Sequence, residues 1–203
     1  MGAALPGVII AGGRATRMGG GDKGLLLAGG QSLIGHVIAR LRPQCGQLAL
    51  NANGDAGRFA DLGLPVLPDS IDGLPGPLAG VLAALDWAAG LGADAVLTAA
   101  ADTPLLPPDL VRRLAQAAGA SACAIAASPD ADGIPRRHPV IGLWRVDARG
   151  DLRAALAAGL RRQGEWAARQ GAEVVIWPSQ PTDPFFNVNT PADLARADEL
   201  VDR

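Results

Sequence analysis

The chain has 203 residues, of which 49% are hydrophobic, so it can bury one sizeable core and a single domain is expected. The formal net charge is -2 and the basic residues are scattered, which argues against a nucleic-acid partner. No apolar stretch is long enough to span a bilayer, so a membrane-spanning protein is not indicated. Cys45 and Cys123 are the only cysteines and form no CxxC or His/Cys cluster, so neither a disulfide framework nor a zinc site is indicated.

The first residues, MGAALPGVIIAGG, lack the basic start and the cleavage site of a signal peptide, so a cytoplasmic location is expected. Short apolar runs then alternate with helical patterns, which is typical of a largely parallel sheet covered on both faces by helices. The expected strands cover residues 5–11, 47–51, 94–100 and 121–127. The helices expected between them cover residues 32–41, capped by Ser32 and ended by Pro43, a stretch from Pro77 onward, and residues 108–118.

From about residue 129 the alternation loosens into a turn-rich stretch, SPDADGIPRRHP. A strand over residues 140–146, an Ala-rich helix, a strand over residues 173–178 and a last helix after Pro191 are expected to follow. No internal repeat and no linker long enough to separate two domains is present, so this part is expected to complete the same domain.

The strongest functional signal is the glycine-rich segment over residues 10–23, IAGGRATRMGGGDK, directly after the first expected strand. In open α/β sheets ligands bind beyond the carboxyl ends of the strands, where a loop with few side chains can bring its backbone N–H groups against a phosphate or a base. The glycines that permit this approach are Gly12, Gly13, Gly19 and Gly20. Arg17 and Lys23 add two cations that could neutralise a triphosphate and stabilise a departing pyrophosphate.

A glycine-rich turn after a strand is often only a tight connection. This segment, however, spans about a dozen residues, whereas structural turns have a median length of ~4–6 residues. It is not a P-loop, because Lys23 is not followed by Ser or Thr. Its first glycines, Gly12 and Gly13, also do not begin a GxGxxG directly after the strand, where a dinucleotide site has that motif. The segment therefore indicates a nucleotide site that is neither an ordinary ATPase site nor a dinucleotide site.

Asp102 is the second signal, because it follows the apolar strand VLTAAA and can face the same crevice as the glycine-rich segment. Magnesium is usually held by one or two carboxylates together with substrate phosphate oxygens and water, so one Asp here suffices for a metal–nucleotide site. The alternative is that Asp102 caps a helix expected near Pro107. Together with the glycine-rich segment, the metal site is favoured.

Asn51 and Asp69 also stand at expected strand ends, although Asn and Asp favour turns intrinsically. Gly76 and Gly80, in the turn PGPLAG, leave room for a ligand against the following helix, and a packing role is equally consistent.

His138 follows two arginines, so this cluster could contact an anionic acceptor or form a solvated basic loop. Asn187 and Asn189 present two amides just before the last helix, and one of them could simply be its N-cap.

The segments that carry a resemblance to a known family are, in chain order, IAGGRATRMGGGDKGLL, NANG, PGPLAG, AADTPLLPPDL, RRHP and FFNVNTPADL. Through them the chain resembles the molybdenum cofactor guanylyltransferase family nearly end to end. The first segment is shared by the wider nucleotidyltransferase superfamily, which includes sugar-nucleotide synthases, whereas PGPLAG and NVNTP are more specific. The resemblance implies a Rossmann-like three-layer α/β/α sandwich with a mostly parallel central sheet, of the nucleotide-diphospho-sugar transferase type. Within a single domain over residues 1–203, residues to about 128 would bind the nucleotide and residues from about 129 would cover the acceptor.

The same resemblance implies transfer of GMP from GTP to Mo-molybdopterin with Mg²⁺, which yields molybdopterin guanine dinucleotide and pyrophosphate. It also leaves room for transient contacts with molybdopterin-delivery proteins and apo-molybdoenzymes. Related cytidylyltransferases typically have Ala where this chain has Gly12, and the missing methyl would leave space for a purine edge. A cytidylyl- or sugar-phosphate nucleotidyltransferase remains an alternative of the same class, and a non-catalytic molybdopterin carrier is an alternative of another class.

The residues and the resemblance together give one set of expected site residues. The GTP-binding group is Ile10, Ala11, Gly12, Gly13, Lys23, Asn51, Asp69 and Asp102. Lys23, Arg17 and Asp102 form the catalytic group, and Asp102 is the expected metal ligand. The acceptor-binding group is Gly20, Asp22, Gly76, Gly80, His138, Asn187 and Asn189.

Overall fold

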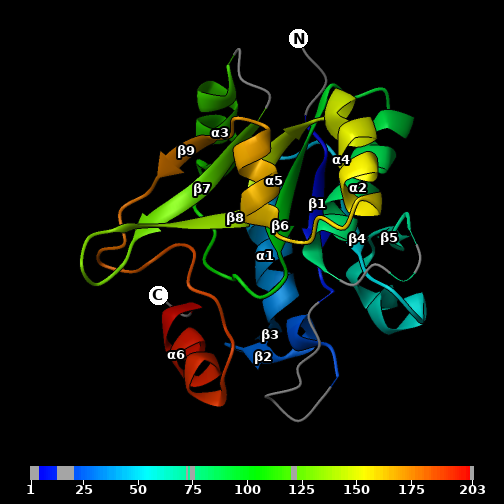
Figure 1. Ribbon diagram of the computed structural model, residues 1–203. Coiled ribbons are helices and arrows are strands. Elements are labelled where there is room, and N and C mark those ends of the chain that lie inside the picture. Colours follow the sequence, from blue (N-terminus) through cyan, green and yellow to red (C-terminus); the bar gives the residue numbers. More distant parts are fainter. Residues whose placement is uncertain (1–4, 13–20, 72, 74–75, 120–122, 202–203) are drawn as a thin grey trace.

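The computed structural model describes the chain except residues 1–4, 13–20, 72, 74–75, 120–122 and 202–203. Its described residues form a seven-stranded sheet in the order β5-β4-β1-β6-β8-β7-β9 (Figure 1). The strands are β1 (Gly7–Ile10), β4 (Leu48–Asn51), β5 (Val66–Leu67), β6 (Ala95–Ala100), β7 (Cys123–Pro129), β8 (Pro135–Arg145) and β9 (Glu173–Ile176). The β1, β4, β5 and β6 strands pair in parallel, as do β7 and β9, so the mostly parallel sheet predicted from the sequence is confirmed.

The β8 strand runs antiparallel to both of its neighbours, β6 and β7. It begins at Pro135, so the prediction that RRHP belongs to a turn-rich stretch was wrong. Proline removes a backbone donor and is tolerated in a sheet only at a strand start or an irregularity, and both prolines of this strand satisfy that rule. Pro135 is its first residue, while Pro139 lies where the register between β7 and β8 shifts.

Helices cover both faces of the sheet. Neighbouring residues of each buried strand point to opposite faces, so each strand packs against helices on both sides. Ile9 packs in the cluster that includes α1 (Leu33–Leu41) and α3 (Leu110–Ala118). Val8 and Ile10 pack in the cluster that includes α2 (Pro77–Gly90), α4 (Arg149–Ala157) and α5 (Gln163–Arg169). The α1 helix is capped as predicted, since the side chain of Ser32 accepts a hydrogen bond from the backbone N–H of Gly35. The single Ala-rich helix expected after β8 is instead two helices, α4 and α5.

The last part of the chain returns to the edge of the sheet where β1, β4 and β6 end. The α6 helix (Pro191–Val201) packs on the hairpin of β2 (Leu27–Ala28) and β3 (Gln31–Ser32), as Figure 1 shows. The backbone N–H of Val188 donates to the carbonyl oxygen of Asp102 over 3.0 Å. This bond brings the NVN segment beside the end of β6.

Three short 3-10 helices complete the described structure: η2 (Lys23–Leu25), η3 (Ala56–Leu62) and η4 (Val146–Ala148). The η2 helix lies beside Ala101, which directly follows β6, and η3 follows β4 after a short loop. Among the described residues, no helix has the length and apolar character needed to cross a membrane.

Candidate active site

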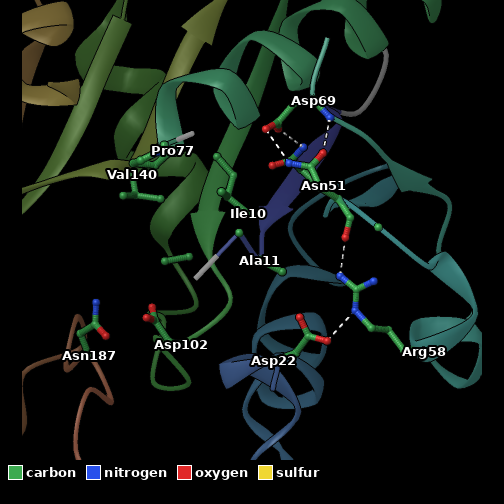
Figure 2. A pocket seen from close by; sticks show the side chains of 15 residues that line it. Ile10, Ala11, Asp22, Asn51, Arg58, Asp69, Pro77, Asp102, Val140 and Asn187 are labelled. Atoms are coloured by element: carbon green, nitrogen blue, oxygen red, sulfur yellow. Dashed lines mark hydrogen bonds and ion pairs between the residues drawn. The ribbon is translucent and has the colours of Figure 1, made fainter. Parts of the chain in front are cut away.

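A cavity of about 520 Å³ opens at the carboxyl ends of β1, β4 and β6. This volume falls within the ~300–1,000 Å³ of small-molecule sites, and the position is where open α/β sheets bind ligands. Figure 2 shows Asp102 and Asn187 on one side of it, Asn51 and Asp69 on another, and Ile10 and Ala11 between them. Its lining residues are Ile10, Ala11, Gly12, Asp22, Asn51, Asn53, Gly54, Arg58, Asp69, Gly76, Pro77, Ala100, Asp102, Val140 and Asn187.

Lys23 connects a predicted catalytic residue with two predicted acceptor-binding residues on one side of the cavity. Its Nζ donates to Asp102 Oδ2 over 2.5 Å, to Asn189 Oδ1 over 2.6 Å and to Asn187 Oδ1 over 3.3 Å. Both members of the Lys23–Asp102 ion pair are largely shielded, with side chains 11% and 19% exposed. Three side chains that lie 79, 164 and 166 residues from Lys23 in the sequence therefore meet at this cation.

Two alternatives considered from the sequence are excluded by the helix starts. The helix after Asp102 begins at Leu110, so Asp102 is not its N-cap. The cap of α6 is Thr190, whose Oγ1 accepts from the backbone N–H of Asp193 over 3.1 Å. The side chains of Asn187 and Asn189 consequently point to Lys23 rather than into a helix terminus.

Asp69 is held on the other side of the cavity by two amides. Asn51, only 2% exposed, donates from Nδ2 to Asp69 Oδ1 over 3.0 Å and to the carbonyl oxygen of Leu67. Asn53 donates from Nδ2 to Asp69 Oδ2 over 2.7 Å and accepts the backbone N–H of Asp69 through Oδ1. The carboxylate is thereby fixed at the cavity wall. Asn53 was not predicted, although its position two residues after Asn51 at the same strand end could have indicated it.

The two glycines of the PGPLAG turn have different positions. Gly76 lines the cavity and precedes α2 with a φ of 136°, which a residue with a side chain rarely adopts. Gly80 is buried behind the cavity wall, where a Cβ would lie 2.3 Å from Asn51 Oδ1 and 3.1 Å from Ile10 Cγ2. Gly80 therefore makes room for the Asn51 side chain, which is the packing role that the sequence left open, and its contact with the acceptor stays a prediction.

We expect Gly80→Ala to displace the Asn51 amide and to break its bond to Asp69. Forcing a methyl group into this packed position should lower the free energy of unfolding by ~1–3 kcal/mol and weaken nucleotide binding. Urea unfolding and nucleotide titration measure the two effects. Gly90→Ala is the matched control, because a Cβ on this second α2 glycine meets no atom within 4 Å. If both variants bind nucleotide as the wild type does, Gly80 has no part in shaping the site.

His138 does not line the cavity. Its Nε2 is 2.9 Å from Ser128 Oγ and its ring lies 4.9 Å from that of Phe185. Burial, reinforced by the nearby Arg136, lowers the pKa of His138 to about 4, so the imidazole is neutral at pH 7. Arg136 pairs with Asp183 over 3.1 Å. The structure thus packs a neutral His138 ring against Ser128 and Phe185, and a contact of this residue with the acceptor stays a prediction.

The lowered pKa of His138 predicts a loss of stability on acidification. The unfolded chain takes up a proton near the ordinary pKa of 6.5, whereas the folded chain resists until about 4, so the free energy of unfolding falls as the pH drops between these values. Allowing for solvent screening, we expect this loss to exceed that of His138→Gln by on the order of 1 kcal/mol. Urea unfolding of both proteins from neutral to acidic pH measures it. Parallel pH profiles would contradict the assignment.

Gly13, Arg17 and Gly20 lie outside the described residues, so their predicted roles stay predictions. Asp22 forms an ion pair with Arg58 over 2.5 Å, and both side chains line the cavity. Arg58 was not predicted from the sequence.

Asp102 is the carboxylate best suited to a metal in this cavity. The described residues contain no group of three or more His, Cys, Asp and Glu side chains that could form a metal cage. Lys23 contacts Oδ2 of Asp102, and no described residue donates to its Oδ1. A single carboxylate oxygen at the wall of the cavity would suit Mg²⁺, which takes most of its ligands from substrate and water.

Comparison with known proteins identifies a family. Residues 7–174 match the model of the MobA-like NTP transferase domain. A molybdenum cofactor guanylyltransferase from Rhodopseudomonas palustris (strain BisB5) is 53% identical over 201 residues, which span 98% of this chain and 94% of the relative. One from Cereibacter sphaeroides is 51% identical over 197 residues, which span 97% of each chain.

Solved structures show the same fold. Molybdopterin-guanine dinucleotide biosynthesis protein A from Archaeoglobus fulgidus superposes with a TM-score of 0.70 at 23% identity, covering 98% of this chain and 99% of the other. The 2-C-methyl-D-erythritol 4-phosphate cytidylyltransferase from Thermus thermophilus superposes with a TM-score of 0.67 at 19% identity, covering 99% and 100%. The predicted α/β sandwich of the nucleotidyltransferase type is thus confirmed. The chain belongs to the MobA-like NTP transferase family, and its near full-length relatives are molybdenum cofactor guanylyltransferases, as its sequence motifs predicted.

Proposed function

We propose that this protein transfers GMP from GTP to Mo-molybdopterin, forming molybdopterin guanine dinucleotide and releasing pyrophosphate. The observation that carries the proposal is the contact of Lys23 with Asp102, Asn187 and Asn189, two of which, Asp102 and Asn187, line a cavity of about 520 Å³. Relatives about 50% identical over nearly the whole chain carry this activity in their names. Their names do not favour cytidylyl or sugar-phosphate transfer.

The nucleoside would lie between the end of β1 and the amide-held Asp69. Ile10, Ala11 and Gly12 bring backbone to the cavity there, and Asn51 supports Asp69 from the other side. A Cβ at Gly12 would meet no described atom within 4 Å, so the space beside it is open to a purine edge. The triphosphate would extend from the nucleoside towards Lys23 and Asp102.

In the proposed reaction, a terminal phosphate oxygen of the acceptor attacks the α-phosphorus of GTP. The bond between the α-phosphorus and the oxygen that bridges to the β-phosphorus breaks, and this oxygen leaves with the pyrophosphate. Mg²⁺, when bound, would supply a Lewis acid that neutralises charge on the phosphates. Asp102 would hold it, while Lys23 would orient the triphosphate and stabilise the departing pyrophosphate.

Pyrophosphate release tests the proposal when GTP, CTP, ATP and UTP are each supplied with and without Mo-molybdopterin. We expect release with GTP alone of the four, and only when the acceptor and Mg²⁺ are present. Preference for CTP would instead make the protein a cytidylyltransferase. Binding of GTP without any pyrophosphate release would favour a non-catalytic carrier. Contacts with delivery proteins or apo-molybdoenzymes, and a cytoplasmic location, stay predictions.

A further inference from the structure

Arg58 is the one cation among the described residues that line the cavity. The same lining contains three carboxylates, those of Asp22, Asp69 and Asp102. It belongs to η3, the short helix after the β4 strand end. Its Nε donates to Asp22 Oδ2 over 2.5 Å, and its Nη2 donates to the backbone carbonyl of Asn53 over 2.6 Å. Nη1 donates to the carbonyl of Asp55. All three nitrogens of the guanidinium are therefore engaged.

The guanidinium is also packed from the side. Its Cζ lies 4.5 Å from the ring centre of Phe59, whose own side chain is 1% exposed. A planar group that stacks on a buried ring and makes three hydrogen bonds has little freedom left to follow a ligand. Figure 2 shows it bridging Asp22 and the loop after β4 along one edge of the cavity.

The ion pair joins two parts of the site that are otherwise separate. Asp22 immediately precedes η2 and Lys23, which anchors the Asp102 side of the cavity. Asn53, whose carbonyl Arg58 binds, holds Asp69 on the nucleoside side through two hydrogen bonds. Arg58 thus links both sides at once.

Charge gives this link a consequence for binding. Asp22 faces a cavity that has to admit a polyanionic nucleotide, and an unpaired carboxylate there would repel the phosphates. The side chains of Asp22 and Arg58 are 24% and 29% exposed, so their pairing is only partly screened by solvent.

We propose that Arg58 is a positioning residue of the transfer reaction, which neutralises and fixes Asp22 so that the cavity accepts the nucleotide. The inference rests on the proposed function only in taking a nucleoside triphosphate as the ligand. The effect of Arg58 on this ligand is exerted through Asp22 and needs no direct contact.

The test measures nucleotide affinity by calorimetric titration in the absence of acceptor, using whichever of the four nucleoside triphosphates the wild type binds. We expect Arg58→Gln to raise the dissociation constant about 10-fold, and Arg58→Lys, which keeps the charge but loses the fork, to raise it by less. Raising the salt from about 0.05 M to about 0.5 M should shrink the Arg58→Gln penalty, because salt screens repulsion. A purely structural loss would not respond in this way.

The decisive comparison uses the Asp22→Asn background, where Arg58→Gln should change the dissociation constant less than about 2-fold. Arg153→Gln is the matched control, since it removes an ion pair of 2.6 Å with Asp86 and lines no part of this cavity. Thermal melting checks folding, and the double variant keeps the test available if Arg58→Gln alone unfolds.

An equal penalty in both backgrounds would mean that Arg58 contacts the nucleotide itself, and no penalty in either would mean that it has no role in binding. Both results overturn the proposal. They differ from failure of the proposed function, in which the wild type binds a nucleotide but releases no pyrophosphate with the acceptor.

Discussion

Replacing Asp102 with asparagine is expected to lower the rate of pyrophosphate release by about 1,000-fold, because the amide keeps the shape of the side chain but removes its charge. The other two carboxylates that line the cavity already have partners, because Asp22 pairs with Arg58 and Asp69 accepts from two asparagine amides. Loss of the charge also releases Lys23 from its closest partner, 2.5 Å away. Both effects act on the same phosphates.

The measurement is turnover as a function of Mg²⁺ concentration, with thermal melting to show that the variant is folded. Asp147→Asn serves as the control, because it removes the charge of an aspartate paired with Arg145 that does not line the cavity. We expect the control to match the wild type. An Asp102→Asn enzyme with near-normal turnover and an unchanged response to Mg²⁺ would remove the metal assignment.

Replacing Lys23 with alanine is expected to lower kcat by ~100- to 1,000-fold, which is the usual effect of removing one group that stabilises charge in the transition state. Lys23 is the only lysine in the chain, and no other cation among the described residues is positioned to bind Asp102 and both asparagines. The loss should fall mainly on turnover and much less on affinity for the acceptor.

Kinetics with both substrates varied separate these effects, and Lys23→Arg is the conservative variant that keeps the charge. A loss of acceptor affinity is the alternative outcome, because Lys23 contacts Asn187 and Asn189, which were predicted to bind the acceptor. A raised KM for molybdopterin with little change in kcat would reassign Lys23 to acceptor binding.

The sequence predicted the elements whose signals are local. The apolar run of β1, the Ser32 cap of α1 and the proline that opens α2 each depend on a few neighbouring residues, and each is present as expected. The site at the carboxyl ends of the strands followed from the parallel topology, since it brings the ends of β1, β4 and β6 to one edge.

The features that were missed depend on distant contacts. The pairing of Arg58 with Asp22 spans 36 residues, and no periodicity or motif encodes it. The early start of β8 depends on pairing with β7 across a register shift, which accommodates prolines that read locally as turn formers. The two arginines before His138 suggested a cationic cluster, but the ring is buried against Phe185, a tertiary contact that the local sequence does not indicate. Local sequence therefore specified the site's position better than its charge network.

A crystal structure of the protein with Mg²⁺ and a GTP analogue that carries a methylene group between the α- and β-phosphates is the most direct test. We expect the guanosine to lie between Gly12 and Asp69, with the phosphates extending to Lys23 and a metal bound by Asp102. A nucleotide seated elsewhere, for example in the hollow lined by Arg161 and Arg162 between α4 and α5, would contradict the assignment of the β1–β4–β6 edge as the active site.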